Sequence, residues 1–256
     1  MVETLLQDER SRNASDPFLK GKRVLAIVPA YNEAGNVQNT IRGLHALPFH
    51  LSILVVNDGS VDSTAQEASA AQAMVVSLPF NLGIGGAVQT GFQFAKEHGF
   101  DLAVQVDGDN QHDVEYFKAL IQPILDGTAD MTIGSRFLPP FTGYRSSFVR
   151  RIGIHFFAQL ISFLTGCKVT DPTSGFRAYN RTMIKIFAAD YPHDYPEPEA
   201  IVVARRYRAR VQEIPVIMRK RSKGYSSIRY FYTLYYMIKV TCAVILAGLK
   251  QKKSAD

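Results

Sequence analysis

Two aspartates stand two positions apart, at Asp107 and Asp109, directly after an apolar run at 102–106. The run is typical of a buried strand, and in an extended chain residues two apart project to the same side. Paired carboxylates repel each other unless a cation joins them, and hard divalent ions share oxygen ligands with substrate phosphates. Gln111 has the same parity and adds an amide oxygen, so the spacing predicts an Mg²⁺ or Mn²⁺ site formed by Asp107, Asp109 and Gln111. A helix N-cap at Asp109 or Asp113 would explain one aspartate but not the pair.

Polar side chains also follow two earlier apolar runs, at 29–33 (Pro-Ala-Tyr-Asn-Glu) and 57–60 (Asn-Asp-Gly-Ser). The short apolar runs predict strands at 24–28, 51–56, 74–78, 102–106 and 131–133. Helices are expected at 36–46, 62–71, 86–97 and 114–125, the second with Asp62 as its N-cap. This alternation is typical of an α/β protein whose mostly parallel sheet has helices on both faces. Because ligands bind beyond the carboxyl ends of such strands, we expect the three polar loops to lie together.

A glycine run, Asn-Leu-Gly-Ile-Gly-Gly at 81–86, precedes one of these helices. It partly matches the dinucleotide-binding fingerprint, but it follows the third predicted strand instead of the first and its last glycine is displaced. Backbone N–H groups at such a helix start could bind an anion, or the glycines could serve close packing of the helix on the sheet. A nicotinamide dehydrogenase is therefore a minor alternative, and the chain has no P-loop motif.

The composition is that of a globular protein, with 256 residues, 46% hydrophobic and 20% charged. The formal net charge is +6, and nine Lys or Arg residues lie between 205 and 229. Such a cluster is either a solvated face or a surface for phosphates, and no nucleic-acid recognition motif accompanies it. Two cysteines without metal spacing favour a reducing compartment, and no apolar leader precedes the first strand.

As an ordered set, six segments resemble family 2 glycosyltransferases of the GT-A fold. They read PAYNE, NDGSVDST, NLGIGGAVQTGF, DGDNQHD, GSRF and DPTSGFRAYNR. The most similar branch is that of dolichol-phosphate mannose synthases and their bacterial polyprenyl-phosphate and polysaccharide relatives. The resemblance covers about 23–225, and it implies a nucleotide-sugar donor together with a metal-dependent transfer of a hexose.

The resemblance also implies roles for individual residues. Donor binding is implied for Pro29, Tyr31, Glu33, Asp58, Asp107, Lys220 and Arg221. Catalytic roles are implied for Asp109, Arg136 and Glu199, and acceptor binding for Arg150 and Arg151. The chain departs from the family pattern at Asn57, where many relatives carry a further aspartate. A second departure is the proline-containing stretch 195–199, so the acceptor is left open.

The resemblance further implies a single displacement that inverts the anomeric carbon. The divalent ion, Arg136 and the pair Lys220 and Arg221 would stabilise the charge on the departing diphosphate. A hydroxyl acceptor would need a general base, for which Glu199 or Glu197 is the candidate. A polyprenyl phosphate is already an anion and needs no base, and Arg150 and Arg151 would hold it.

Two apolar segments, at 149–164 and 230–249, suggest attachment to a membrane that carries a polyprenyl-phosphate or other lipid-linked acceptor. Aromatic residues at the start of the second segment and lysines after it favour a helix lying in the interface. The alternatives are a helix packed in the core or in a homo-oligomer, and a true span. We therefore expect a tail at 1–20, a catalytic domain at 21–228 and a membrane-associating helix at 229–256. The expected location is the cytoplasmic, inner face of the cell membrane.

Two other classes remain as alternatives. A nucleotidyltransferase would carry a glycine-rich loop with basic residues after the first strand, but residues 29–33 include no Lys or Arg. A non-catalytic module that binds nucleotide-sugars would not need both Asp107 and Asp109. Turnover of a labelled donor separates this module from an enzyme.

Overall fold

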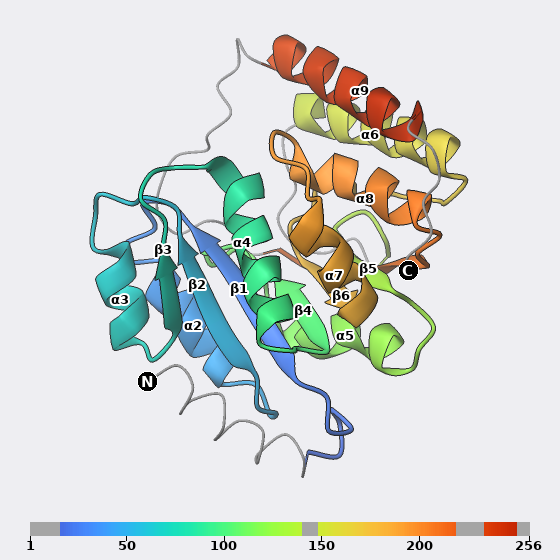
Figure 1. Ribbon diagram of the computed structural model, residues 1–256. Coiled ribbons are helices and arrows are strands. Elements are labelled where there is room, and N and C mark those ends of the chain that lie inside the picture. The colour runs from blue at the N-terminus through green and yellow to red at the C-terminus, as the bar shows by residue number, and fades with distance from the viewer. Residues whose placement is uncertain (1–15, 140–147, 219–232, 250–256) are drawn as a thin grey trace.

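The computed structural model describes residues 16–139, 148–218 and 233–249. Its centre is a seven-stranded sheet in the order β3-β2-β1-β4-β6-β5-β7 (Figure 1). The strands are β1 (Val24–Ala30), β2 (Ser52–Asn57), β3 (Met74–Ser77), β4 (Leu102–Gln105), β5 (Met131–Ser135), β6 (Arg177–Asn180) and β7 (Val211–Pro215). All neighbouring pairs are parallel except those of β6, which runs antiparallel to both β4 and β5. The predicted mostly parallel sheet is confirmed.

Helices cover both faces of the sheet. They are α2 (Val37–His45), α3 (Thr64–Ala70), α4 (Gly83–Glu97), the 3₁₀ turn η1 (Val114–Tyr116), α5 (Phe117–Leu125), α6 (Phe148–Thr165), α7 (Arg181–Ala189), α8 (Pro196–Arg206) and α9 (Thr233–Leu249). Alternate residues of each strand point to opposite faces, so Leu25 and Ile27 join one core cluster and Ala26 and Val28 the other. The α/β GT-A architecture expected from the sequence has this two-faced core.

The expected N-cap of the second helix is wrong by one position. Helix α3 begins at Thr64, and its N-cap is Ser63. Asp62 lies one residue earlier, where its carboxylate accepts hydrogen bonds from the Thr64 N–H at 3.0 Å and from the Ala34 N–H at 3.1 Å. Asp62 therefore joins the loop after β1 to the loop after β2.

Helix α9 packs on α8 and α6 instead of standing apart from the domain (Figure 1). Val240, Val244 and Ala247, spaced three and four apart, are buried in the same core cluster as α4 and α7. At the other end of the chain, Leu19 falls in the segment predicted as a tail but is fully buried. Within the described residues, no helix has both the length and the apolar character that crossing a bilayer requires.

Candidate active site

The polar loops after β1, β2 and β4 meet at one edge of the sheet. Strand β1 lies between β2 and β4 and is parallel to both, so the three carboxyl ends are neighbours. Asp58 N donates to Ala30 O at 2.9 Å, and the Thr40 hydroxyl of α2 donates to Gly108 O at 3.4 Å. The convergence predicted from the sequence is confirmed.

His112 and Gly175 surround the Asp107 carboxylate. His112 is buried, accepts a hydrogen bond from Asp107 N at its Nδ1 (3.2 Å), and places Nε2 3.4 Å from Asp107 Oδ2. Its ring stacks on Phe176 with centroids 5.0 Å apart. A Cβ at Gly175 would lie 2.8 Å from both Asp107 carboxylate oxygens, closer than real contacts allow. Only glycine at 175 leaves room for the carboxylate in this position.

Asp109 and Gln111 form a tight turn after Asp107. Asp109 Oδ1 accepts a hydrogen bond from Gln111 N at 3.0 Å, and Asn110 between them has a positive φ of 60°. Asp113 then caps η1 by accepting from Glu115 N at 3.2 Å. Of the two N-cap candidates, Asp109 and Asp113, the structure therefore selects Asp113. Helix capping does not explain why carboxylates stand at both 107 and 109.

The electrostatics around Asp107 suit a divalent cation. Partial burial raises the pKa of Asp107 to about 6, with Arg136 opposing the shift and the charge of Glu33 adding to it. Within 16–139, 148–218 and 233–249, no three Asp, Glu, His or Cys side chains form a complete metal cage. Mg²⁺ commonly takes one or two protein carboxylates and fills its remaining positions with water and substrate phosphates. The all-oxygen set of Asp107, Asp109 and Gln111 fits an ion held in this shared way.

Arg136 lies close enough to Asp107 to influence its charge, but a different acid orients it. Its Nε and Nη2 donate to the two oxygens of Asp171 at 2.6 and 2.7 Å, and Nη2 also donates to the Thr173 hydroxyl at 2.8 Å. The Asp171 side chain is fully buried and that of Arg136 is 16% exposed. Asp171 was not singled out from the sequence, although it stands in the quoted segment DPTSGFRAYNR.

The residues expected to bind the donor lie on the loops after β1 and β2. Pro29 is buried at the end of β1, while Tyr31 beyond it is 49% exposed. The Glu33 carboxylate accepts a hydrogen bond from the Asn36 side chain at 2.8 Å. Asp58 is buried and accepts from Leu82 N at 2.7 Å, so it fixes the loop that leads into α4.

The glycines at the start of α4 serve its local geometry: Gly83 has a positive φ of 80°, and Gly85 packs closely on a neighbouring loop. A Cβ at Gly85 would collide with the carbonyl oxygens of Pro192 and His193, and one at Gly91 with Ile27 of β1. Gly83 N donates to the Asn81 side chain at 2.9 Å, so part of the helix start is capped from within the chain. The packing interpretation of these glycines is therefore supported over a dinucleotide fingerprint.

Two glutamates occupy the first turn of α8, and the charge of Asp107 acts on one of them. Burial raises the pKa of Glu197, a shift that Arg177 opposes and the charge of Asp107 increases. Arg177 itself is fully buried and donates to the carbonyls of Ser174, Glu197 and Pro172 at 2.6 to 2.8 Å. Glu199, the first candidate from the sequence, lies two residues further along the same turn and is half-buried.

The remaining basic candidates are only partly described. Arg151 is exposed in the first turn of α6. The Arg150 side chain, Lys220 and Arg221 lie outside the described part of the structure. Met218, two residues before Lys220, forms an isolated antiparallel bridge with His112, so the chain passes the loop 107–113 shortly before this basic pair.

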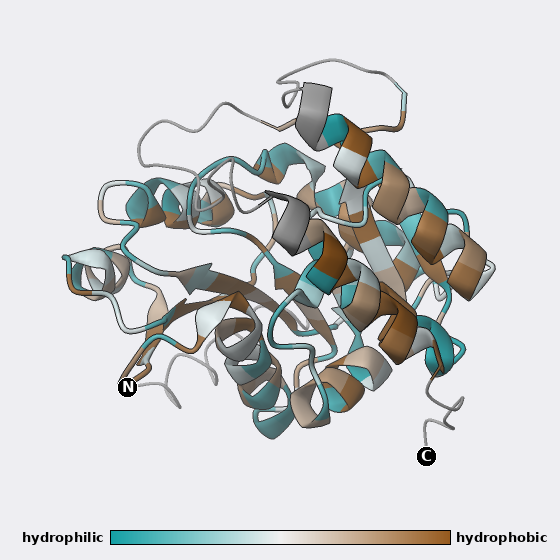
Figure 2. Ribbon diagram, turned by 90° about the horizontal axis from the view of Figure 1, so that it is seen from above, coloured by the Kyte–Doolittle hydropathy of each residue, from teal (hydrophilic) through white to brown (hydrophobic). Residues whose placement is uncertain are grey.

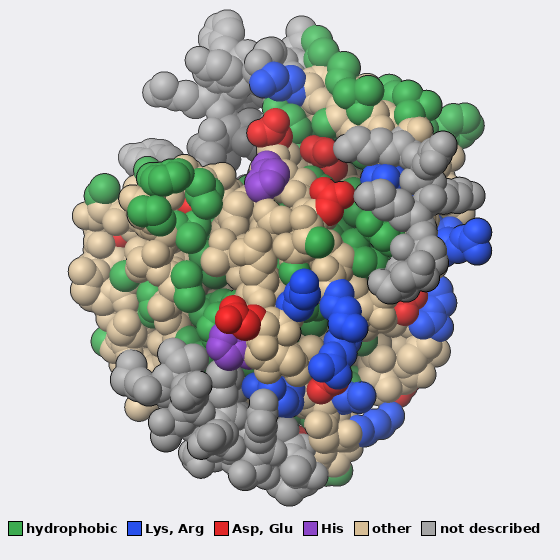
Figure 3. All heavy atoms as spheres, viewed as in Figure 1, with side chains coloured by type: hydrophobic (Ala, Val, Ile, Leu, Met, Phe, Trp, Pro, Cys, Tyr) green, Lys and Arg blue, Asp and Glu red, His purple; other side chains and the backbone are tan. Residues whose placement is uncertain are grey.

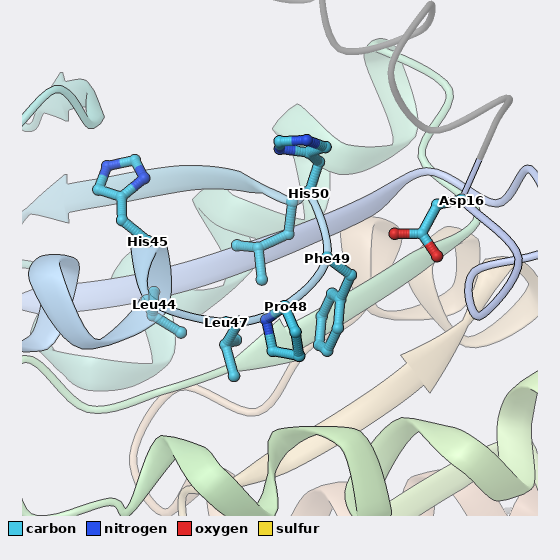
Figure 4. Close-up of a pocket in the computed structure, with 8 residues that line it drawn as sticks. Asp16, Leu44, His45, Leu47, Pro48, Phe49 and His50 are labelled. Carbon is cyan, nitrogen blue, oxygen red and sulfur yellow. The ribbon is translucent and has the colours of Figure 1, made fainter.

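A pocket of about 190 Å³ lies elsewhere, on the loop that leads into β2 (Figure 4). Its lining is Asp16, Leu44, His45, Leu47, Pro48, Phe49, His50 and Leu51. It is smaller than the 300 Å³ or more that is typical of ligand sites. Asp16 accepts hydrogen bonds from Phe18 N and Leu19 N, so its carboxylate closes a turn. The pocket precedes β2 and is not part of the site at the carboxyl edge.

The fit at Gly175 makes a direct prediction. Gly175→Ala is expected to displace the Asp107 carboxylate and weaken Mn²⁺ binding by at least about 10-fold, in keeping with the usual cost of disturbing a ligand's surroundings. Isothermal titration with Mn²⁺ in the presence of a nucleoside diphosphate measures this change. Gly153→Ala in α6 is the control, because its Cβ would meet only the Met237 sulfur at 3.8 Å. Equal affinities in the two variants would contradict the tight fit.

Comparison with known proteins agrees with this geometry. The model of the family described as Glycosyl transferase family 2 matches residues 25–187. A UDP-N-acetylglucosamine–dolichyl-phosphate N-acetylglucosaminyltransferase of Methanococcus voltae is 28% identical, with 76% of this chain and 85% of that protein covered. An undecaprenyl-phosphate mannosyltransferase of Micrococcus luteus is also 28% identical, with coverages of 80% and 87%.

A solved structure has the same fold. Glucosyl-3-phosphoglycerate synthase from Mycobacterium tuberculosis, in complex with Mn²⁺, UDP-glucose and phosphoglyceric acid, matches with a TM-score of 0.70. The match covers 95% of this chain and 83% of that chain at 18% identity. At this identity the similarity establishes the GT-A fold alone.

Proposed function

Because this chain belongs to glycosyl transferase family 2, we propose that it transfers a sugar from a nucleotide-diphosphate sugar to an acceptor at a membrane surface. The favoured acceptor is a polyprenyl phosphate, with a lipid-linked glycan as the second choice, in the synthesis of cell-envelope polysaccharide or glycolipid. The observation that carries the proposal is the loop of Asp107, Asp109 and Gln111 at the end of β4, which meets the loops after β1 and β2 at one edge of the sheet. The named activities of the relatives from Methanococcus and Micrococcus support the acceptor class.

The proposed mechanism is a single displacement with inversion. When bound, a divalent ion on Asp107, Asp109 and Gln111 would supply positive charge to the donor diphosphate. Arg136, held in place by Asp171, would stabilise the charge that grows on the leaving group, together with Lys220 and Arg221. Pro29, Tyr31, Glu33 and Asp58 would bind the nucleoside at the adjoining loops.

The function is tested with purified protein and a panel of nucleotide-sugars. A matching donor with Mn²⁺ should raise the melting temperature by mass action, because it binds only the folded protein. The same donor should then transfer its labelled sugar to polyprenyl phosphate, with release of the nucleoside diphosphate. Stabilisation without turnover on any lipid-linked acceptor would favour a non-catalytic module.

The acceptor class predicts which glutamate matters. If the acceptor is a phosphate, Glu197→Gln and Glu199→Gln should each retain kcat within about threefold, since no proton must be removed. If it is a hydroxyl, loss of the general base should lower kcat by about 100-fold or more. Glu197 and Glu199 both lie in the first turn of α8, so the variant that loses activity in that case identifies the base and the other serves as its neighbour control. Assays of both variants on the acceptor that supports transfer by the wild-type protein decide between the two.

We further propose that α6 and α9 place the site at the inner, cytoplasmic face of the cell membrane. Their outer faces expose large apolar side chains. These residues are Ile152, Phe156, Phe163, Ile238, Ile245, Leu246 and Leu249. The ribbons of both helices carry many hydrophobic residues (Figure 2), and hydrophobic side chains gather on the surface over α9 (Figure 3). Contiguous apolar faces of this kind, next to exposed Arg151, are typical of contacts with an anionic bilayer surface.

The membrane face is tested by vesicle binding. Phe163→Glu combined with Leu246→Glu places two charges among side chains that are 85% and 62% exposed, so the fold should survive while binding falls by about 10-fold or more. Co-sedimentation with vesicles that contain anionic lipid gives the bound fraction. Val61→Glu, at a valine that is 91% exposed on the loop before α3, is the matched control. Unchanged binding by the double variant would remove α6 and α9 from the contact.

A further inference from the structure

A single side chain of β7 fastens the turn between α6 and β6. The Glu213 carboxylate accepts hydrogen bonds from the Thr170 N–H at 2.8 Å, the Thr170 hydroxyl at 2.7 Å and the Asp171 N–H at 2.8 Å. Hydrogen bonds to an ionised acceptor are about twice as strong as neutral ones, and only a carboxylate offers enough lone pairs for three such donors. Removal of Glu213 would leave two backbone N–H groups of this turn without their acceptor.

The fastened turn carries the acid that orients Arg136. Asp171 is fully buried and forms the two-bond ion pair with the guanidinium, and its Oδ2 also accepts from Arg136 N at 3.1 Å. Ser135, directly before Arg136, shares a hydrogen bond of 2.7 Å with the Thr170 hydroxyl. A shift of the backbone at 170–171 would therefore move the Asp171 carboxylate, which holds the Arg136 guanidinium. It would also move the Thr170 hydroxyl, which bonds the residue before Arg136.

The chain that follows Glu213 also reaches the loop 107–113. Val216 N, just after β7, donates to Ser135 O at 3.0 Å, and Met218 bridges to His112. His112 in turn contacts Asp107 through its ring. Residues 213–218 thus contact the Thr170–Asp171 turn at one end and His112 at the other. One short segment therefore links Arg136, which Asp171 holds, to Asp107, which His112 contacts.

From these contacts we propose that Glu213 is a positioning residue for sugar transfer. It holds the Thr170–Asp171 turn in place, so that Asp171 keeps the Arg136 guanidinium positioned to bind the donor phosphates. The role of Arg136 in this statement rests on the proposed function. The mechanical link from Glu213 to the turn does not depend on it.

A double-mutant cycle tests whether Glu213 acts through Arg136. Glu213→Ala is expected to lower kcat/KM by about 10- to 100-fold, the cost of a small misplacement of a charged group. In an Arg136→Ala background the same change should cost less than about threefold, because the residue that it positions is absent. Equal losses in both backgrounds would overturn the proposal. Gln212→Ala is the control on the same strand, since its side chain donates instead to Thr128 O at 3.2 Å.

Hydrogen–deuterium exchange gives a readout that needs no turnover. Glu213→Ala should speed exchange in the peptide that covers 169–173 and leave that of β1 unchanged. Glu213→Gln, which keeps one acceptor oxygen, should lie between wild type and alanine, and it serves if the alanine variant does not fold. Unchanged exchange at 169–173 in both variants would overturn the link. If wild-type protein transfers no sugar, the proposed function fails, and this measurement still decides the positioning of the turn.

Discussion

Asp109→Ala is expected to lower sugar transfer by at least about 100-fold while the protein stays folded. Loss of one preorganised charge that acts on a developing anion typically costs on the order of 3 kcal/mol in the barrier. Asp109 lies in a loop turn outside the helices and strands, where its carboxylate accepts a hydrogen bond from Gln111 N, so the sheet and its covering helices should remain in place without it. The assay is turnover of a labelled nucleotide-sugar with Mn²⁺, with circular dichroism as the check of folding.

Asp113→Ala is the matched control for this variant, because it removes a carboxylate from the same loop. Asp113 caps η1 through Glu115 N, so its loss should cost about 1 kcal/mol of stability and little activity. A fully active Asp109→Ala, or an equal loss in the two variants, would remove Asp109 from the chemistry.

Asp171→Asn is expected to lower the free energy of unfolding by about 3 kcal/mol and to reduce transfer strongly. The change leaves the largely buried Arg136 guanidinium without a counter-charge, and breaking a buried pair by removing one partner costs about 3–5 kcal/mol. Urea denaturation measures the loss in stability. Activity should fall as well, because the two-bond geometry that orients Arg136 is gone.

Arg210→Ala supplies the contrast of an exposed pair. Arg210 bonds Asp130 at 2.9 Å, but its side chain is 56% exposed, so solvent screens the pair and its loss should cost far less stability than the loss of Asp171. A similar loss of stability in the two variants would show that burial of the Asp171–Arg136 pair has no special weight.

The sequence predicted the first five strands because each one contains a short apolar run between helical segments, and all of them except β3 are buried along their whole length. Strand β6 was missed, since Arg177 and Asn180 leave its four residues without an apolar pattern. Its partners explain the exception: Arg177 is buried on backbone carbonyls, and β6 pairs with neighbours on both sides. Strand β7 was missed for a related reason, because its polar side chains bond to other loops.

In the candidate site, too, some features could be predicted from the sequence and others could not. Spacing alone predicted the convergence of three loops, which the structure confirms, and it placed Asp107, Asp109 and Gln111 on one of them, because strand periodicity and parallel order determine these positions. It did not identify Asp171 as the partner of Arg136, which depends on a fold contact 35 residues away in sequence. Nor could the pattern of α9 distinguish membrane contact from packing, since the helix uses one face for the core and exposes the other.

The location of Mn²⁺ in a crystal grown with a nucleoside diphosphate tests the central claim most directly. Anomalous scattering at the manganese edge should place the ion between the carboxylates of Asp107 and Asp109, bridged to the diphosphate. An ion and diphosphate bound away from residues 107–111 would contradict the account.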